Sequence, residues 1–342
     1  MKVLLYFENA KLIKKSGIGR ALEHQKKALD LNGIEWTTSR HDSYDIAHVN
    51  TYSPKSRKLV EKCVKSGVPV IVHGHSTKED FANSFVFWKL LKPFIYKSIE
   101  KCYCLPDEII TPTDYSKRLI ENYDFVKCPV VAISNGVDLA QYKNTTVTKS
   151  EEIELRRQFG IGENQKIVMG IGWMFERKGF HDFIKIGKMF PEVAFVWFGS
   201  KNKMLNTKKI NKSIKKKTYN VKLPGYKPRD TIIKMLHIAD CFLFPSYEET
   251  EGIVLLEAMA CGCPVVIRNI GAFDYLTDGT NCLKAESNIG FKQQISRCLS
   301  EDMTEIVNNA YQIVEDRDLK HVGEKLKAEY EKLLNNKKEE QN

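Results

Sequence analysis

Four glutamates lie close together around one short apolar run of the sequence. The segment 246–266 reads SYEETEGIVLLEAMACGCPVV, with three glutamates ahead of a glycine and a fourth, Glu257, among valine, leucine and alanine. A buried carboxylate is unfavourable unless it is paired or hydrogen-bonded. Glu257 is therefore expected either to face solvent on a half-exposed helix, or to lie in the interior and gain its partner when a ligand binds.

The spacing of Glu249 and Glu257 suits an elongated ligand that carries hydroxyl groups. If 241–246 is a strand and 253–260 the helix after it, the two carboxylates lie roughly 12 Å apart along a helix axis. That is the separation of the sugar ring and the ribose in a nucleotide sugar, and carboxylates accept hydrogen bonds from the hydroxyls at each end. The diphosphate would then lie against the positive end of the helix.

Two cations follow the strand that the sequence predicts at 167–172. Arg177 and Lys178 precede Gly179 at the carboxyl end of that strand. Charge-assisted hydrogen bonds to a diphosphate are worth roughly 1.5–3 kcal/mol each. The alternative is an ordinary basic turn in solvent.

Gly17 and Gly19 in the motif KSGIGRA allow backbone amides to approach a phosphate at a helix start. The signal is weak, because an ordinary turn has the same composition. A dinucleotide fingerprint is disfavoured, since the preceding strand ends near Phe7 and Leu22 takes the place of the third glycine.

His73 and His75 lie in VIVHGHST, at the end of another predicted strand. A neutral imidazole can hydrogen-bond a sugar hydroxyl or move a proton. A purely structural role is the alternative for either ring. His73, the first after the strand, is the favoured sugar contact, with His75 as a further sugar or acceptor contact.

The elements that must position these residues form two similar series. Short apolar strands at 3–7, 45–50, 69–75 and 108–113 alternate with helical patterns, and a second series follows at 166–173, 194–200, 220–226, 241–246 and 264–269. This alternation is typical of parallel sheets covered by helices, in which ligands bind at the carboxyl ends of the strands. We therefore predict an α/β fold with two Rossmann-like domains facing a cleft, at residues 1–145 and 146–318. A C-terminal helix at 319–342, with a disordered end, is expected to pack back on the first domain.

Composition limits the class of protein. The 342 residues carry a net charge of +10, which suits a phosphorylated substrate, an anionic membrane surface or nucleic acid. The nine cysteines form no even framework, and the C-x-C pairs Cys102–Cys104 and Cys261–Cys263 lack the second pair of a zinc site, which predicts reduced thiols and a cytoplasmic location. The short apolar run at 3–7 predicts no signal peptide, and no apolar run in the sequence reaches the length that a membrane span needs.

The segment 245–266 resembles the signature of family-4 retaining glycosyltransferases of the GT-B fold, in which two glutamates flank seven residues ahead of an Ala-Met-Ala-Cys-Gly segment. SNGVDLAQY, TPTDYSKRLIENY, LPGY and GAFDYLTDGTNCL are also similar to family elements, so the resemblance covers nearly the whole chain. It implies that Glu249 contacts the donor sugar and that Glu257 holds the ribose. The amides around Gly252, Ile253 and Val254 would meet the sugar and diphosphate.

One position departs from the family pattern. Family members have an arginine directly after the strand glycine and a lysine five residues later, whereas Trp173 follows Gly172 here and Lys178 is in place. Arg177 is the candidate replacement. The resemblance implies sugar transfer with retention of the anomeric configuration, by same-face attack assisted by the departing phosphate, and neither a metal nor a cofactor is expected.

The acceptor must be inferred from the first domain. The stretch 81–104 is rich in phenylalanine, tryptophan and lysine, and resembles an interfacial membrane helix; a core helix with a solvated face is the alternative. Its predicted membrane contacts are Phe87, Trp88, Lys89, Leu91 and Lys92. The lysine-rich stretch 201–222 either touches anionic lipid or forms a solvated loop.

KSGIGRA, HGHST and SYEETEGI together are similar to bacterial enzymes that add a second sugar to monoglucosyldiacylglycerol, whose products anchor lipoteichoic acid. The resemblance implies a UDP-sugar donor of galactose or glucose, a diacylglycerol glycolipid acceptor and a peripheral position on the inner face of the cell membrane. A transferase acting on capsular or other cell-surface polysaccharide intermediates is the alternative. Nucleic acid is not an expected partner, since no helix-turn-helix or aromatic-basic platform is recognisable.

Overall fold

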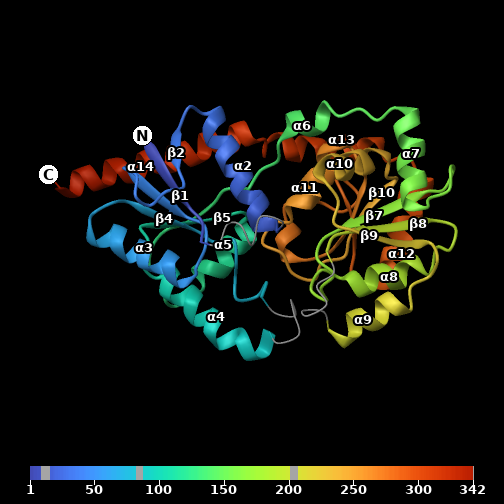
Figure 1. Cartoon of the computed structure of the whole chain (residues 1–342), viewed down its shortest axis with the longest axis horizontal. Helices are drawn as coiled ribbons and strands as arrows, with labels where there is room; N and C mark the ends of the chain where they lie inside the picture. Colours follow the sequence, from blue (N-terminus) through green and yellow to red (C-terminus); the bar gives the residue numbers. More distant parts are fainter. Residues whose placement is uncertain (9–15, 82–87, 201–206, 342) are drawn as a thin grey trace.

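The computed structural model describes residues 1–8, 16–81, 88–200 and 207–341. It contains two six-stranded parallel sheets, one from each half of the chain, each covered by helices on both sides (Figure 1). The predicted α/β class with two facing Rossmann-like sheets is therefore confirmed. Within the described ranges, no helix is both long and apolar enough to cross a bilayer.

The first sheet has the strand order β2-β1-β3-β4-β5-β6. Its central strands are buried on both faces, which explains why they read as continuous apolar runs in the sequence. The strand bounds are β1 Lys2–Tyr6, β2 Glu35–Thr37, β3 Ile46–Val49, β4 Val70–His73, β5 Glu108–Thr111 and β6 Val130–Ala132.

The second sheet has the order β12-β11-β10-β7-β8-β9. Strands β7 and β10 are adjacent at its centre, so the loops after both strands open at the same edge. The bounds are β7 Ile167–Ile171, β8 Ala194–Phe198, β9 Val221–Gly225, β10 Cys241–Phe244, β11 Val265–Arg268 and β12 Leu283–Ala285.

Helices connect the strands of each sheet. In the first half they are α2 Gly17–Leu31, α3 Pro54–Lys65, α4 Trp88–Tyr103, α5 Asp114–Glu121 and α6 Leu139–Lys143. In the second half they are α7 Lys149–Phe159, α8 Phe180–Gly187, α9 Lys208–Lys215, α10 Arg229–Ile238, α11 Ile253–Ala260, η1 Gly271–Phe273, α12 Asn288–Ser300, α13 Thr304–Glu315 and α14 Leu319–Gln341.

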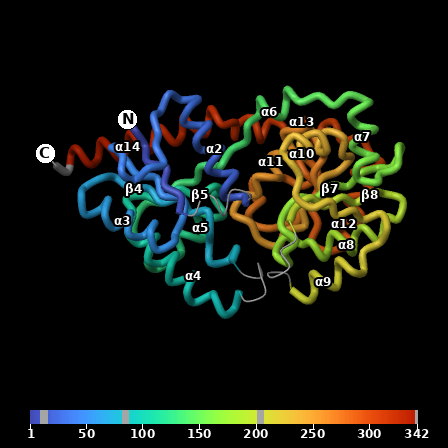
Figure 2. The backbone as a smooth tube through the Cα atoms, viewed as in Figure 1, coloured from blue at the N-terminus to red at the C-terminus, as the bar shows by residue number. Residues whose placement is uncertain are grey.

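The C-terminal helix α14 returns to the first sheet. Figure 2 shows its red tube running from the second lobe across the first, beside α2. Leu326 and Tyr330 are buried in the same apolar cluster as Val3 and Leu5 of β1. The approach to α2 requires a glycine, because a Cβ on Gly323 would lie 2.2 Å from the Ala28 carbonyl oxygen. The end of the chain is therefore part of the first domain's core.

Candidate functional site

The three glutamates after β10 point to three different sets of partners. Glu248 accepts a hydrogen bond from the Tyr115 hydroxyl at 2.9 Å, and Glu251 accepts one from the Asn135 side chain at 2.8 Å. Tyr115 and Asn135 both belong to the first half of the chain, so these two glutamates join the domains. Glu249 lies between these two glutamates in the sequence, and its side chain contacts Arg177 and Lys178 of the second domain.

Glu249 is buried beside two cations from the loop after β7. Its carboxylate lies 2.5 Å from Lys178 Nζ and 3.7 Å from the Arg177 guanidinium. Burial alone would raise the pKa of Glu249, but Lys178 and Arg177 outweigh it and hold the pKa below its usual range. The structure thus brings together Glu249, Arg177 and Lys178, as the sequence predicts, at the carboxyl ends of β7 and β10. The two cations keep the carboxylate of Glu249 ionised.

A glycine lets the two loops meet. Gly179 has a φ of +67°, and a Cβ there would lie 2.1 Å from the Pro245 carbonyl oxygen at the end of β10. Any side chain would therefore push the Lys178 turn away from the β10 loop. This close approach is the physical reason for glycine directly after Lys178.

The first turn of α11 starts immediately after these glutamates. Gly252 precedes it with a φ of +84°, and no side chain caps the helix start. Ile253 and Val254, both partly exposed, form the first turn. Uncapped amides and the positive end of the helix dipole favour an anion at this position. The predicted Gly252, Ile253 and Val254 therefore lie where a phosphate would be stabilised.

Glu257 has partners before any ligand binds, so the expectation that it waits in the interior without a partner is wrong. The side chain is buried, and its carboxylate lies 2.7 Å from an Arg229 nitrogen and 3.6 Å from an Arg20 nitrogen. A buried charge is tolerated when it is paired in this way. The sequence analysis missed both arginines, although Arg20 belongs to the quoted motif KSGIGRA.

The glycine motif starts α2 and directs Arg20 toward Glu257. The Gly19 amide already donates to the Ser16 hydroxyl at 3.2 Å, which leaves it less suited to a phosphate than the sequence predicts. Gly17 is exposed, with open space around its Cα. The observed contribution of this motif is the salt bridge from α2 to α11.

The two predicted histidines stack on one another at the end of β4. Their ring centroids are 3.8 Å apart, and both side chains are buried. His75 Nε2 lies 2.9 Å from the Asn50 side-chain oxygen, whereas His73 Nε2 is buried without a partner in the described part of the chain. Burial lowers the pKa of His75 to about 3, so the ring is neutral at physiological pH. The unpartnered nitrogen favours His73 as the ring that meets a ligand.

Asp80 is a further acidic group near the cations, and the sequence analysis did not select it. Burial raises the pKa of Asp80 to about 6, and Arg177, Glu249 and Lys178 all lie within electrostatic range. Its position after the HGHST motif was the available signal.

Trp173, which replaces the arginine of the family pattern, stacks on an aromatic neighbour. Its ring centroid lies 5.7 Å from that of Phe175, with the planes nearly parallel. Trp173 therefore places an apolar ring where the family pattern has a cation. The cations of this loop are Arg177 and Lys178 instead.

Among the predicted membrane contacts, Lys89, Leu91 and Lys92 are exposed on α4 and Trp88 is half-buried. Phe87 lies outside the described residues. Leu90 and Phe94, which are not among these five predicted contacts, are 70% and 73% exposed. The first two turns of α4 therefore present apolar and basic side chains together.

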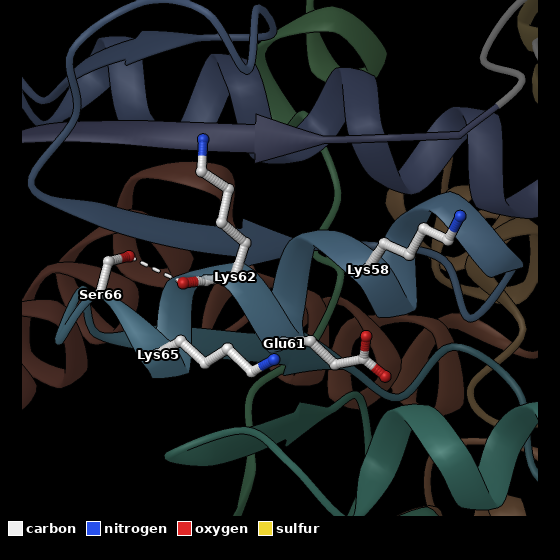
Figure 3. A pocket seen from close by; sticks show the side chains of 5 residues that line it. All are labelled: Lys58, Glu61, Lys62, Lys65 and Ser66. Atoms are coloured by element: carbon white, nitrogen blue, oxygen red, sulfur yellow. Dashed lines mark hydrogen bonds between the residues drawn. The ribbon is translucent and has the colours of Figure 1, made fainter.

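A separate shallow hollow lies on α3, away from all these residues. Its volume is about 360 Å³, and Figure 3 shows its lysines spread along an open helix face rather than converging on a point. The lining residues are Lys58, Glu61, Lys62, Lys65 and Ser66. Nothing in this hollow matches the predicted chemistry. Among the described residues, no group of histidine, cysteine and acidic side chains has a metal-binding arrangement.

Glu248→Gln is expected to flatten the pH dependence of stability. Burial raises the pKa of Glu248 to about 7, so between an ordinary carboxyl pKa and about pH 7 the folded state holds a proton that the unfolded chain releases. Stability therefore falls as the pH rises through this window, by at most about 3 kcal/mol and by about 1 kcal/mol for a half-exposed group. The wild type should lose about 1–3 °C more in Tm than the variant between about pH 5 and pH 8.

The control is Glu163→Gln, which changes an exposed carboxylate in a turn. It should behave as the wild type. Equal Tm losses in all three proteins would contradict the assignment of a raised pKa to Glu248.

Arg229→Met should destabilise the chain by about 2–4 kcal/mol, because it leaves the buried Glu257 with only the more distant Arg20. The double variant Arg229→Met/Glu257→Met removes both charges and should be less destabilised than the single variant. Denaturant unfolding measures both free energies. A double variant as unstable as Arg229→Met alone would show that the pair is not the source of the loss.

Comparison with known proteins agrees with this geometry. The family described as Glycosyltransferase Family 4 matches residues 29–141, and the family described as Glycosyl transferases group 1 matches residues 151–313. The processive diacylglycerol alpha-glucosyltransferase of Acholeplasma laidlawii is 48% identical over 337 residues, covering 98% of this chain and 99% of that protein. The alpha-galactosylglucosyldiacylglycerol synthase of Streptococcus pneumoniae is 31% identical over 134 residues, covering 38% of this chain and 36% of that protein.

Among solved structures, HepE of Anabaena in complex with UDP and glucose superposes with a TM-score of 0.78 at 18% identity, covering 97% of this chain and 100% of that one. This likeness shows the shared GT-B fold. Because the alignment with the Acholeplasma laidlawii enzyme extends over nearly the whole of both chains and the two family matches fall in successive halves, this chain belongs to the group 1 and family 4 glycosyltransferases.

Proposed function

We propose that the chain transfers glucose from UDP-glucose to a diacylglycerol glycolipid, with retention of the anomeric configuration. The name of the 48% identical relative supports a glucosyl donor and a diacylglycerol acceptor. Galactose is the second candidate, supported by the name of the shorter match from Streptococcus pneumoniae. Monoglucosyldiacylglycerol is the proposed acceptor, which gives a diglycosyldiacylglycerol.

The proposed donor site rests on one observation. Glu249 is buried and ionised beside Lys178 and Arg177, a few residues before the uncapped start of α11. In the proposed complex Glu249 accepts hydrogen bonds from the sugar hydroxyls. The diphosphate lies against the first turn of α11 with Lys178 beside it, and Glu257, in the middle of the helix, binds the ribose. The complexes of HepE with UDP and glucose and with UDP-glucose support a donor of this class.

The name of the 48% identical relative, an alpha-glucosyltransferase, supports an α-linked product and therefore retention. UDP-glucose is an α-glycoside, and an α-linked product therefore keeps the configuration of the donor. Glu249 is a poor nucleophile, because two cations stabilise its charge. Same-face attack by the acceptor hydroxyl is the proposed route, with the leaving phosphate taking up the acceptor proton. Lys178, Arg177 and the α11 amides stabilise the charge that develops on the leaving group.

The membrane is the proposed source of the acceptor. Leu90, Leu91 and Phe94 are exposed on α4, and Lys89 and Lys92 lie beside them. Helix α9, which carries exposed lysines, lies along the same lower edge of Figure 1 on the other domain. Apolar side chains that enter the headgroup region, with lysines that attract anionic lipid, suit a peripheral enzyme on the inner face of the cell membrane.

Glu249→Gln should reduce kcat for glucosyl transfer by about 10²–10³-fold. The amide keeps the volume but loses the charge that the sugar hydroxyls and Lys178 both use. Transfer from UDP-glucose to monoglucosyldiacylglycerol in mixed vesicles, followed by mass spectrometry, measures the effect. Glu163→Gln is the matched control in an exposed turn. Near-normal turnover in Glu249→Gln, with an unchanged melting profile, would remove Glu249 from the donor site.

The double variant Leu90→Asp/Phe94→Asp should lose at least about tenfold in partition onto anionic vesicles, because it replaces the apolar surface that enters the membrane with charges. Liposome flotation at low salt measures the loss. Ile289→Asp, at a side chain that is 60% exposed on α12, is the control and should float as the wild type does. If the wild type fails to float, the capsular or polysaccharide alternative becomes the better account of the acceptor.

A further inference from the structure

The buried histidines His48, His73 and His75 form one hydrogen-bonded cluster with residues from distant parts of the chain. His48 Nε2 of β3 lies 3.1 Å from His73 Nδ1 of β4, and His48 Nδ1 lies 2.7 Å from the Tyr330 hydroxyl of α14. His48 and Tyr330 are fully buried. In the proposed donor site His73 contacts the sugar, whereas His48 and Tyr330 have no role there.

The rings in this cluster are neutral. Burial lowers the pKa of His48 to about 3 and the pKa of His73 well below its usual range. A neutral imidazole carries one proton, on either Nδ1 or Nε2, and the neighbouring hydrogen bonds decide which. The cluster therefore sets the tautomer of each ring rather than its charge.

Asn50 fixes the direction of the hydrogen bonds. Its amide nitrogen donates to the Gln25 side-chain oxygen at 2.9 Å and lies 3.5 Å from the His48 carbonyl oxygen, which can only accept. The Gln25 amide nitrogen must then donate, and the Tyr330 hydroxyl oxygen accepts a hydrogen bond from it. The Tyr330 hydroxyl in turn donates its proton to His48 Nδ1, which lies 2.7 Å away. His48 Nδ1 is therefore an acceptor, and the proton of this ring lies on Nε2.

The tautomer of His48 determines the tautomer of His73. Since His48 Nε2 carries the proton, it donates to His73 Nδ1, which must accept. The proton of His73 then lies on Nε2, the nitrogen that is buried without a partner in the described residues. An unpaired buried N–H is unfavourable, so this position favours a ligand with an acceptor oxygen.

This free N–H lies at the contact between the domains. His73 ends β4, and the backbone oxygen of His75, two residues later, accepts from the Thr250 hydroxyl at 3.4 Å. Thr250 directly follows Glu249, the residue proposed to hold the donor sugar. The unpartnered nitrogen and that carboxylate therefore belong to segments that meet.

We infer that Tyr330 and His48 are positioning residues, which fix the Nε2–H tautomer of His73 so that it donates to an oxygen of the transferred sugar. Tyr330 donates to His48 Nδ1, His48 donates to His73 Nδ1, and His73 donates to the sugar. The inference rests on the proposed function for the identity of the ligand. It gives the C-terminal helix, far from the donor loop in sequence, a defined effect on the site.

The tautomer can be measured without any substrate. Two-bond ¹H–¹⁵N correlation spectra of ¹⁵N-histidine-labelled protein report which ring nitrogen carries the proton, and a His73→Gln sample assigns the signal. We expect a pure Nε2–H pattern for His73 in the wild type. In His48→Phe, which removes the donor to His73 Nδ1, the Nδ1–H form should become populated. A Nδ1–H pattern in the wild type, or no change in His48→Phe, overturns the inference.

Kinetics test the effect on transfer. Tyr330→Phe should lower kcat by about 3–10-fold and His48→Phe by about 10–100-fold. Neither variant should change the KM for UDP-glucose by as much as about twofold. His48→Gln retains an amide N–H for His73 Nδ1 and should recover part of the lost kcat. Tyr275→Phe, which also removes a buried hydroxyl but in the second domain, should leave kcat unchanged. Melting temperatures show whether each variant is folded, and His48→Gln keeps the test valid if His48→Phe does not fold.

The outcomes separate this inference from the proposed function. If the tautomer changes but kcat does not, the histidine cluster is structural and the inference is wrong. Equal kcat losses in His48→Gln and His48→Phe contradict it in the same way. If the wild type transfers no sugar from any UDP-sugar while the tautomer pattern is as expected, the proposed function fails and the hydrogen-bond chain stands.

Discussion

The arrangement of the candidate donor site depends on one buried ion pair, between Glu249 and Lys178. A carboxylate taken out of water would normally become protonated, and only the adjacent cations keep Glu249 ionised. The pair also holds the loop after β10 against the loop after β7, and the glycine at 179 allows their backbones to touch. An ionised carboxylate on a fixed backbone, at the start of a helix, is an acceptor for sugar hydroxyls.

The neighbouring glutamates also attach the loop after β10 to the first domain. Glu248 and Glu251 bind side chains of the first domain, so the loop that carries Glu249 is held from both sides. Glu257, about one turn into α11, is held by arginines from α2 and α10. Each buried charge therefore has a partner, as the low polarity of the interior demands. His73 Nε2 is one of several buried polar atoms that have no hydrogen-bond partner among the described residues.

Much of the fold was predictable because strands buried on both faces leave continuous apolar runs. Strands β2, β6 and β12 were missed, since each has only three residues and all three lie at sheet edges. Glu249, Arg177 and Lys178 could be placed together because the carboxyl ends of adjacent parallel strands share an edge. The partners of Glu257 could not, because a single sequence does not show which distant arginines converge on one carboxylate. For the same reason Tyr330, in a charged helical tail, gave no sign of its contact with His48.

The most direct test of the central claim is a crystal structure of this chain with UDP-glucose. We predict that the glucose hydroxyls lie within hydrogen-bond distance of Glu249, the diphosphate against the first turn of α11, and the ribose hydroxyls at Glu257. A nucleotide sugar bound elsewhere, with the pair of Glu249 and Lys178 unchanged and no ligand atom near it, would contradict the account.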